Sequence, residues 1–308
     1  MSKDLWIWID GQFVPKNAAK ISAFSQTFHY GFGVYEGIRS YENENGPAIF
    51  RLTDHVDRLF QSAALLNIRI PYEVQTVCEL HVDVMQKNQL TNAYLRPVVF
   101  MGDEYLGLHT QQSSVHLMIA AIPWNNFYIK SEQINRGISL KTSTHERMIL
   151  KNDVHKAKAN GHYLISILAN NEAHDAGCDE ALMLDSQGYI AEGSGANIFM
   201  VKNNQLHTPL LHCVLDGITR KTVIQIAADQ GIETIEKNIT PDELLRADEV
   251  FFTGTAAEVL AITKIDGHVI GTGVMGKTTQ QLRQLYIQTV TGKIDQYQHW
   301  LSRSSEAH

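Results

Sequence analysis

The sequence predicts an α/β protein of the α+β type that is divided into two domains. The chain has 308 residues, which is long for a single hydrophobic core. Its first hundred residues alternate short apolar strands with amphipathic helices. The stretch Pro-Trp-Asn-Asn at 123–126 interrupts this alternation, which begins again beyond Gly137. We therefore expect a small α/β domain at 1–122, an interdomain linker at 123–136 and a large domain at 137–308.

Composition and charge exclude several functional classes. An apolar content of 44% and a charged content of 19% are typical of a globular protein. The net charge of −7, without a basic cluster, argues against a nucleic-acid partner. The first residues have the pattern of neither a signal peptide nor a membrane span, so we expect a cytoplasmic protein that binds no membrane.

The cysteines and histidines indicate neither disulfides nor a metal. The three cysteines are widely spaced and odd in number, which is typical of a reducing compartment. The fourteen histidines include no pair with metal-ligand spacing. We predict that the protein has no metal site.

The N-terminal half contains a hairpin, a glycine-rich segment and two helices. Residues 5–14 predict two strands joined by a turn at Asp10-Gly11. The segment 29–39 alternates glycines with aromatic residues, which fits either a pocket wall or a twisted core strand. Thr53 is the expected N-cap of a helix with an apolar stripe at Val56, Leu59, Phe60 and Ala63. A second amphipathic helix carries Val74, Val77, Cys78, His81, Val84 and Met85 on one face.

The sequence pattern alone does not decide the roles of two arginines in this half. Arg58 lies opposite the apolar stripe of its helix, and its position alone suggests a solvated side chain. Residues 93–100 predict a strand in which Arg96 shares a face with Tyr94. A buried arginine needs an anionic partner, so Arg96 either forms a structural ion pair or binds a ligand.

Two lysines, Lys156 and Lys158, precede a helix that begins near Tyr163. The helix is predicted from apolar residues at helical intervals, and Gly177 marks its end. Neighbouring cations or partial burial lower the pKa of a lysine, which makes the amine a better nucleophile. The segment is therefore either a covalent-cofactor site or a solvated basic turn.

The rest of the chain contains small-residue turns at strand and helix ends. Glu192-Gly193-Ser194-Gly195 follows a strand, although a lone Gly-x-Gly occurs in many tight turns. Residues 215–220 open a helix whose first N–H groups are suited to a phosphate. Thr240-Pro241-Asp242-Glu243 predicts a capping box. The strand at 249–252 leads into a turn at 253–258 that is either an anion site or a plain loop.

These segments, in this order, resemble the branched-chain amino acid aminotransferases, which are fold type IV pyridoxal phosphate enzymes. The resemblance covers nearly the whole chain. Its landmarks are Tyr35-Glu36-Gly37-Ile38-Arg39, Arg58, Tyr94-Leu95-Arg96-Pro97, Lys158 with Tyr163, Glu192-Gly193-Ser194-Gly195, Gly217-Ile218-Thr219-Arg220 and Thr253-Gly254-Thr255-Ala256-Ala257-Glu258. The resemblance implies pyridoxal 5'-phosphate at the domain interface and a large domain that carries the cofactor lysine.

The resemblance also implies roles for individual residues. Lys158 corresponds to the lysine that forms the Schiff base, and Lys156 to a helper or bystander. Glu192 resembles the carboxylate that pairs with the pyridine nitrogen, and Tyr163 the phenol that hydrogen-bonds the ring oxygen. Arg58 resembles a phosphate ligand, which reverses its interpretation as solvated. The expected remainder of the phosphate site is Ile218, Thr219 and Thr255.

The implied substrates are leucine, isoleucine or valine and 2-oxoglutarate, which one pocket must accept in turn. Arg96 stands at the position of the family's arginine for the glutamate γ-carboxylate. The other expected substrate-binding residues are Tyr30, Tyr35, Tyr94, Leu106, Leu108, Trp124, Thr255, Ala256 and Ala257. The loop with Leu106 and Leu108 resembles one that reaches a neighbouring subunit, which implies a homodimer at least, or a homohexamer. The stretch 124–128 is one residue longer than the family pattern, and Ala196 replaces a common glutamate.

Two rival functions remain at the level of sequence. One is another activity on the same fold, a D-amino acid transaminase or an aminodeoxychorismate lyase. Arg39 and Arg96 favour the branched-chain reaction over both. The other rival is a cofactor-free binding protein that retains the fold. The presence of both Lys158 and Glu192 argues against it.

Overall fold

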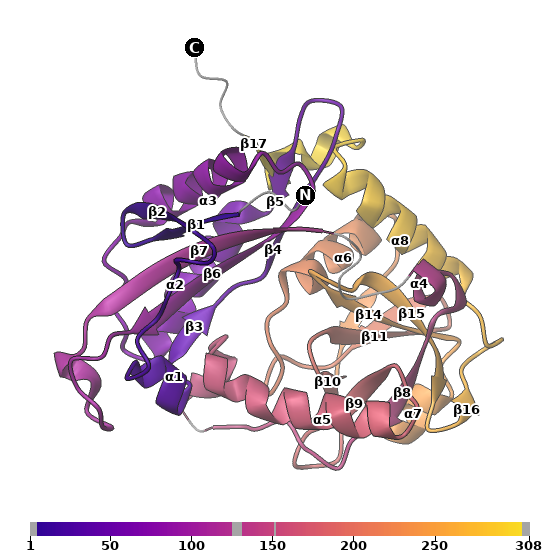
Figure 1. Ribbon diagram of the computed structural model, residues 1–308. Coiled ribbons are helices and arrows are strands. Elements are labelled where there is room, and N and C mark those ends of the chain that lie inside the picture. Colours follow the sequence, from indigo (N-terminus) through magenta and orange to yellow (C-terminus); the bar gives the residue numbers. More distant parts are fainter. Residues whose placement is uncertain (1–4, 125–130, 151, 304–308) are drawn as a thin grey trace. The chain divides into compact units, whose positions relative to one another are not determined.

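The computed structural model describes residues 5–124, 131–150 and 152–303 (Figure 1). The chain divides into two compact units. The first unit comprises Met1–Asn125, Ala157–His162 and Thr289–His308, and the second comprises Asn126–Lys156 and Tyr163–Gln288.

The first unit is built on an antiparallel sheet. In the described residues its strands follow the order β17-β5-β4-β6-β7-β1-β2, and β3 pairs with β6. Its elements are β1 (Trp6–Ile9), β2 (Gln12–Pro15), α1 (Gln26–Tyr30), β3 (Gly33–Tyr35), β4 (Ile38–Tyr41), β5 (Ala48–Phe50), α2 (Leu52–Leu65), α3 (Val74–Asn88), β6 (Ala93–Met101), η1 (Thr110–Gln112), β7 (Val115–Pro123), η3 (Asn160–His162), η4 (Asp295–Trp300) and β17 (Leu301–Arg303).

The predicted hairpin at the start of the chain is confirmed. Ile9 pairs with Gln12 across a two-residue turn. Both turn residues have positive φ, 45° at Asp10 and 90° at Gly11. This geometry matches the right-handed twist of paired strands.

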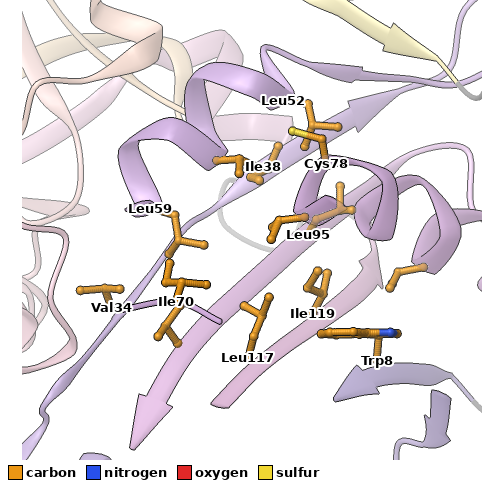
Figure 2. Close-up of a cluster of buried hydrophobic side chains, with 14 of the residues drawn as sticks. Trp8, Val34, Ile38, Leu52, Leu59, Ile70, Cys78, Leu95, Leu117 and Ile119 are labelled. Carbon is orange, nitrogen blue, oxygen red and sulfur yellow. The ribbon is translucent and has the colours of Figure 1, made fainter. Parts of the chain in front are cut away.

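Helices α2 and α3 pack against each other, and α3 contacts β1 and β7 of the sheet. Figure 2 shows the core of this unit, in which side chains from helix and sheet meet. Leu59 of α2, Leu95 of β6 and Ile119 of β7 are all fully buried. Burying one such side chain contributes roughly 1.5–3 kcal/mol, so this cluster is a principal source of the unit's stability.

The start of α2 differs from the prediction that Thr53 is its N-cap. The helix begins at Leu52, and Arg51 is the N-cap residue, with φ 50° and no side-chain cap. The Arg51 amide donates to the carbonyl oxygen of Trp300 at 2.7 Å, and its Nε donates to Asp54 at 2.8 Å. Because Trp300 is distant in the sequence, the local pattern could not reveal this start.

Residues 157–162 belong to the first unit although they lie between two segments of the second. Ala159 forms an antiparallel bridge with Val34 of β3, and the Gly161 amide donates to the Gly31 carbonyl at 3.0 Å. A Cβ on Gly31 would lie 2.9 Å from the Cα of Gly161, and Gly31 has φ 67°. Only glycine allows this approach without strain.

The limits of the two compact units differ from the predicted domain boundaries. The division falls between Asn125 and Asn126 rather than at the ends of a linker at 123–136. Residues 125–130 of that linker lie outside the described part of the chain. Lys158 is grouped with the first unit instead of with the domain at 137–308. The bridge between Ala159 and Val34 and the hydrogen bond from the Tyr35 amide to the Lys158 carbonyl, both formed across a long sequence separation, account for that grouping.

The second unit contains a mixed sheet. In the described residues its strands follow the order β10-β9-β8-β15-β14-β11-β12-β13, with β16 beside β15. The pairs β8–β9, β8–β15 and β12–β13 are parallel and the others antiparallel. Its elements are α4 (Ser131–Arg136), β8 (Ile138–Thr142), η2 (Val154–Lys156), α5 (Tyr163–Asp175), β9 (Glu180–Leu184), β10 (Ile190–Gly193), β11 (Asn197–Lys202), β12 (Gln205–Thr208), α6 (Ile218–Asp229), β13 (Thr234–Glu236), α7 (Pro241–Leu245), β14 (Glu249–Gly254), β15 (Glu258–Ile265), β16 (His268–Val269) and α8 (Lys277–Val290), the last two residues of which belong to the first unit.

Helix α5 is present as predicted, but its apolar residues do not form the buried face. Leu164, Ile167 and Leu168 are 61%, 57% and 40% exposed. The buried positions are Ser166, Ala169 and Ala173, and the two alanines pack with residues of β9. Small residues allow the helix to approach the sheet closely. None of the helices in the described residues is long and apolar enough to cross a membrane.

Candidate active site

The environments of the two lysines differ. Lys156 is exposed, and its Nζ pairs with Asp153 at 3.1 Å. Lys158 is half-buried, and its backbone amide donates to the Ser62 hydroxyl of α2 at 3.0 Å. The Lys158 carbonyl accepts a hydrogen bond from the Tyr35 amide at 3.1 Å. Lys158 is therefore held between α2 and β3, whereas Lys156 forms a surface ion pair.

Arg96 lies among aromatic side chains of the same unit. Its Nη2 donates to the Tyr94 hydroxyl at 2.7 Å, and its guanidinium carbon is 4.5 Å from the centre of the Tyr35 ring. The Tyr35 ring also contacts Lys158, whose Nζ is 4.8 Å from the ring centre. A Cβ on Gly37 would overlap the Tyr94 hydroxyl, so glycine is required for this arrangement. The predicted pairing of Tyr94 and Arg96 on one face of β6 is confirmed by the alternating burial of the strand.

Trp124 extends this aromatic cluster, and the Arg39 side chain contacts the Trp124 ring. The Trp124 ring stacks on Tyr94 with a centroid distance of 6.1 Å and an interplanar angle of 26°. The Arg39 guanidinium lies 3.8 Å from the Trp124 ring centre and 4.4 Å from that of Tyr41. Such contacts are favourable because a cation is attracted to the face of an aromatic ring. The other predicted aromatics of the 124–128 stretch lie outside the described residues.

Arg58 forms an ion pair with the buried Glu36, so its side chain is not solvated as its helix position suggested. It is 13% exposed and donates from Nε to Glu36 Oε1 at 2.6 Å and from Nη2 to Oε2 at 2.9 Å. His55 Nδ1 lies 2.8 Å from Glu36 Oε2. Burial alone raises the pKa of Glu36, but the Arg58 charge and the His55 hydrogen bond together hold the pKa well below its usual range.

His55 is a neutral hydrogen-bond donor in this group. Burial lowers the pKa of His55, and the attraction of Glu36 opposes that shift without cancelling it. A neutral imidazole that contacts a carboxylate through Nδ1 carries its proton on that atom. Glu36 is thus the single negative charge among these three side chains, and Arg58 the single positive charge.

In the second unit, Glu192 is held by three donors. Arg147 Nη2 pairs with Oε1 at 2.6 Å, while Asn197 Nδ2 and the Leu215 amide donate to Oε2 at 3.1 and 3.3 Å. The Glu192 side chain is 5% exposed. The strand end of β10, the start of β11 and the segment before α6 therefore converge on one carboxylate.

The start of α6 and the turn between β14 and β15 provide further hydrogen-bond donors, which are backbone N–H groups and threonine hydroxyls. The N-cap residue of α6 is Gly217, which makes no side-chain cap, and the first N–H groups of a helix have no acceptor within the helix. Ile218 and Thr219, in the first turn, are both 4% exposed. Thr255 is half-buried in the turn that follows β14. The Oγ1 of Thr253 is buried without a hydrogen-bond partner in the described residues.

The remaining predicted site residues differ in how far they are exposed. Ala256 and Ala257 are half-buried in the same turn as Thr255, and Tyr163 is the half-buried first residue of α5. Tyr30 is the last residue of α1 and is 48% exposed.

The loop after β6 is exposed but anchored at its backbone. Leu106 and Leu108 are 50% and 86% exposed. The side-chain amide of Gln26 donates to the carbonyls of Tyr105 and Gly107 at 2.9 Å each. These bonds hold the loop so that its leucines face away from the unit's own core.

One group in the described residues brings potential metal ligands together. Asp185, His212 and Cys213 place ligand atoms within 4.8 Å of one another. Asp185 already accepts hydrogen bonds from His212 Nε2 and from the amides of Gln187 and Tyr189. Burial raises the pKa of Cys213 to about 12, so its thiol is protonated. These hydrogen bonds hold Asp185 and His212 together.

Residues 33–265 match the family model "Amino-transferase class IV". This chain belongs to the class IV aminotransferase family. The aminotransferase is 44% identical over 298 residues to the "Branched-chain-amino-acid aminotransferase" of Pseudomonas aeruginosa, with 97% of each chain covered.

Solved structures of branched-chain amino acid aminotransferases have the same fold as this chain. This aminotransferase matches the T.th. branched-chain amino acid aminotransferase with pyridoxamine 5'-phosphate at a TM-score of 0.95 and 42% identity, covering 98% of this chain and 99% of that one. Complexes of that enzyme with N-(5'-phosphopyridoxyl)-L-glutamate and with 4-methylvaleric acid match at TM-scores of 0.94 and 0.93, each with 41% identity and the same coverage. The predicted fold type IV architecture is confirmed.

Several partners of the predicted residues in this aminotransferase were not predicted from the sequence. Arg147 pairs with Glu192, and no motif around Arg147 indicated it. Asn197 lies five residues after Glu192, close enough in sequence to be suspected. Glu36 stands inside a landmark motif, but its contact with Arg58 joins residues 22 positions apart.

Proposed function

We propose that this aminotransferase transfers the amino group of L-leucine, L-isoleucine or L-valine to 2-oxoglutarate, giving the branched 2-oxo acid and L-glutamate. The names of its relatives support the branched-chain substrates. The observation that carries the proposal is the placement of Arg96 against Tyr35, whose ring also contacts Lys158. A cation surrounded by aromatic rings suits a pocket that accepts apolar side chains and a carboxylate in turn.

The cofactor is pyridoxal 5'-phosphate. The chemistry of the groups present fits this cofactor: a half-buried lysine, a paired arginine, a helix start with glycine at its N-cap and a buried carboxylate. Lys158 is the covalent anchor, and Tyr163 hydrogen-bonds the ring oxygen. Arg58, Thr255 and the backbone of α6 at Ile218 and Thr219 bind the phosphate. Helix N-termini and charge-assisted hydrogen bonds are the usual means of holding phosphate in proteins.

The proposed chemistry depends on two residues. When bound, the cofactor accepts the electron pair released at the substrate α-carbon. Glu192 keeps a proton on the pyridine nitrogen, and Arg147 and Asn197 hold its carboxylate in place. Lys158 Nζ would take the proton from the substrate α-carbon as a general base and pass it to the carbon of the cofactor that receives the amino group.

The two substrates use the same pocket in turn. Arg96 binds the γ-carboxylate of glutamate, whereas Tyr30, Tyr35 and Trp124 contact the branched apolar side chains. Thr255, Ala256 and Ala257, together with Tyr94, bind the α-carboxylate that both substrates share. The related T.th. enzyme has been solved with both a glutamate derivative of the cofactor and 4-methylvaleric acid, a branched apolar acid, which supports one pocket for both classes.

The assembly is a homodimer or a larger homo-oligomer in the cytoplasm. Leu106 and Leu108 are exposed on a backbone-anchored loop, and large apolar side chains in such positions favour a subunit contact. The contact we propose places this loop against the substrate site of a neighbouring subunit. Sedimentation of the purified protein gives the number of subunits.

A panel of amino donors with 2-oxoglutarate tests the function. L-Leucine, L-isoleucine and L-valine should yield glutamate, whereas D-alanine should not. Turnover of D-alanine would identify a D-amino acid transaminase, and release of pyruvate from aminodeoxychorismate would identify a lyase. A colourless protein that gains no yellow colour with added pyridoxal phosphate would identify the cofactor-free binding protein.

A further inference from the structure

Glu36 is a fully buried carboxylate at the turn between β3 and β4. Its side chain is 0% exposed, and both oxygens are engaged by Arg58, which donates at 2.6 Å to Oε1 and at 2.9 Å to Oε2. His55 contacts Oε2 at 2.8 Å. The three side chains come from two parts of the fold, since Arg58 and His55 both lie on α2. Two bonds to one guanidinium fix its plane as well as its distance.

Stability alone does not account for this pair. Removing two charges from water is costly, and an apolar pair of similar volume is often as stable as a buried ion pair. The residue before Glu36 is Tyr35, whose ring contacts both Arg96 and Lys158. The ion pair therefore links α2 to the backbone segment that carries the substrate and cofactor contacts.

We propose that Glu36 is a positioning residue for the cofactor phosphate, acting through Arg58. The inference rests on the proposed function, in which Arg58 binds that phosphate. Glu36 orients the guanidinium, and the His55 hydrogen bond orients Glu36 in turn. The site then meets the phosphate with a donor that is already in place, so less side-chain entropy is lost on binding.

A competing role for Glu36 predicts the opposite change in phosphate affinity when Glu36 is replaced. If Glu36 served only to neutralise Arg58, its negative charge would weaken phosphate binding, because the net charge of the pair is zero. Replacing Glu36 by glutamine would then strengthen the binding of an anion. If Glu36 orients Arg58, the same replacement removes one charge-assisted contact and weakens the binding. The direction of the change separates the two roles.

The experiment measures the affinity of apoenzyme for pyridoxamine 5'-phosphate and for pyridoxamine. Neither compound forms a Schiff base with Lys158, and the two differ only in the phosphate. The variants are Glu36→Gln, Arg58→Ala and the double variant. Asp54→Asn is the matched control, because Asp54 pairs with Arg51 on the same helix. Retention of wild-type circular dichroism and thermal midpoint shows that each variant folds.

We expect Glu36→Gln to weaken pyridoxamine 5'-phosphate binding about 10- to 100-fold, the usual effect of a hydrogen bond to a charged group. Binding of pyridoxamine and the Asp54→Asn control should stay near wild type. In the Arg58→Ala background, Glu36→Gln should have no further effect on phosphate binding, because coupled residues are not additive.

Three results would overturn the inference. Tighter phosphate binding by Glu36→Gln would assign the neutralising role. Unchanged binding by Glu36→Gln, with Arg58→Ala weakened, would remove the positioning role and leave the proposed function intact. Unchanged binding by Arg58→Ala would remove Arg58 from the phosphate site and so contradict the site proposed above. If Glu36→Gln does not fold, Glu36→Asp replaces it: the charge is kept, but the shorter side chain loses the two-bond contact and should show the same loss.

Discussion

Arg147 Nη2 lies 2.6 Å from Glu192 Oε1, and both side chains are largely buried. The pair fixes the position of the Glu192 side chain, which we propose faces the pyridine nitrogen. Glu192→Gln should retain a yellow, cofactor-bound protein and slow the half-reaction with leucine. The loss should reach several kcal/mol in barrier, at about 1.4 kcal/mol per tenfold in rate, because an amide cannot keep the ring nitrogen protonated by charge.

Single-turnover absorbance measurements test this prediction. Glu180→Gln is the control, since Glu180 is a glutamate on the neighbouring strand β9. An unchanged leucine half-reaction in Glu192→Gln would remove the proposed role.

Lys158→Ala should abolish turnover while the protein stays folded. The substitution removes the covalent anchor and the proton carrier together, and loss of one general base typically lowers the rate by about 10² to 10⁴. Borohydride reduction followed by peptide mapping should label Lys158 in the wild type.

Lys156→Ala is the natural control for this change. Lys156 forms only an exposed pair with Asp153 in the described contacts, so the variant should retain near-normal activity. An inactive Lys156→Ala together with an active Lys158→Ala would reverse the two assignments.

Arg96→Leu should separate the two half-reactions. Removing one partner of a buried charge pair costs about 3–5 kcal/mol, so the barrier with glutamate and 2-oxoglutarate should rise by a similar amount. The leucine half-reaction should change by only about 1 kcal/mol, because leucine gains an apolar neighbour. Rapid-mixing measurements of each half-reaction provide both values. Equal losses for both substrates, with a lower thermal midpoint, would show instead that Arg96 only supports strand β6.

The capping box of α7 should make the stability of the protein depend on pH. The Lys237 hydrogen bond, followed by that of the Thr240 amide, lowers the pKa of Glu243 from 4.5 to about 2. A carboxyl group with a lowered folded-state pKa stabilises the protein above its unfolded pKa and loses that effect as the pH falls towards the folded value.

Glu243→Gln tests this dependence, because glutamine keeps a capping acceptor but not the charge. The variant should be less stable than wild type at pH 7, and the difference should shrink between pH 4.5 and about 2. Thermal midpoints across this range measure it, with the exposed Glu44→Gln as control. A difference that stays constant with pH would show that the charge of Glu243 contributes nothing.

Much of the local structure was predictable from the sequence. The Asp10-Gly11 hairpin, the amphipathic faces of α2 and α3 and the Thr240 capping box all depend on residues within a few positions of one another. Their periodicity and turn chemistry are visible in the chain itself. The family resemblance likewise depended on short motifs in a fixed order, and the comparisons confirm the family.

The environments of the charged side chains were decided by tertiary structure. Position in the helix suggested a solvated Arg58, yet it pairs with Glu36, and Arg147 was not suspected as the partner of Glu192. The two lysines look alike in sequence, but only Lys158 is enclosed by α2 and β3. A charge is buried only where a distant segment supplies its partner, and local spacing contains no information about that partner. The sequence by itself therefore determined the elements and the family, whereas packing determined which charges are buried and what orients them.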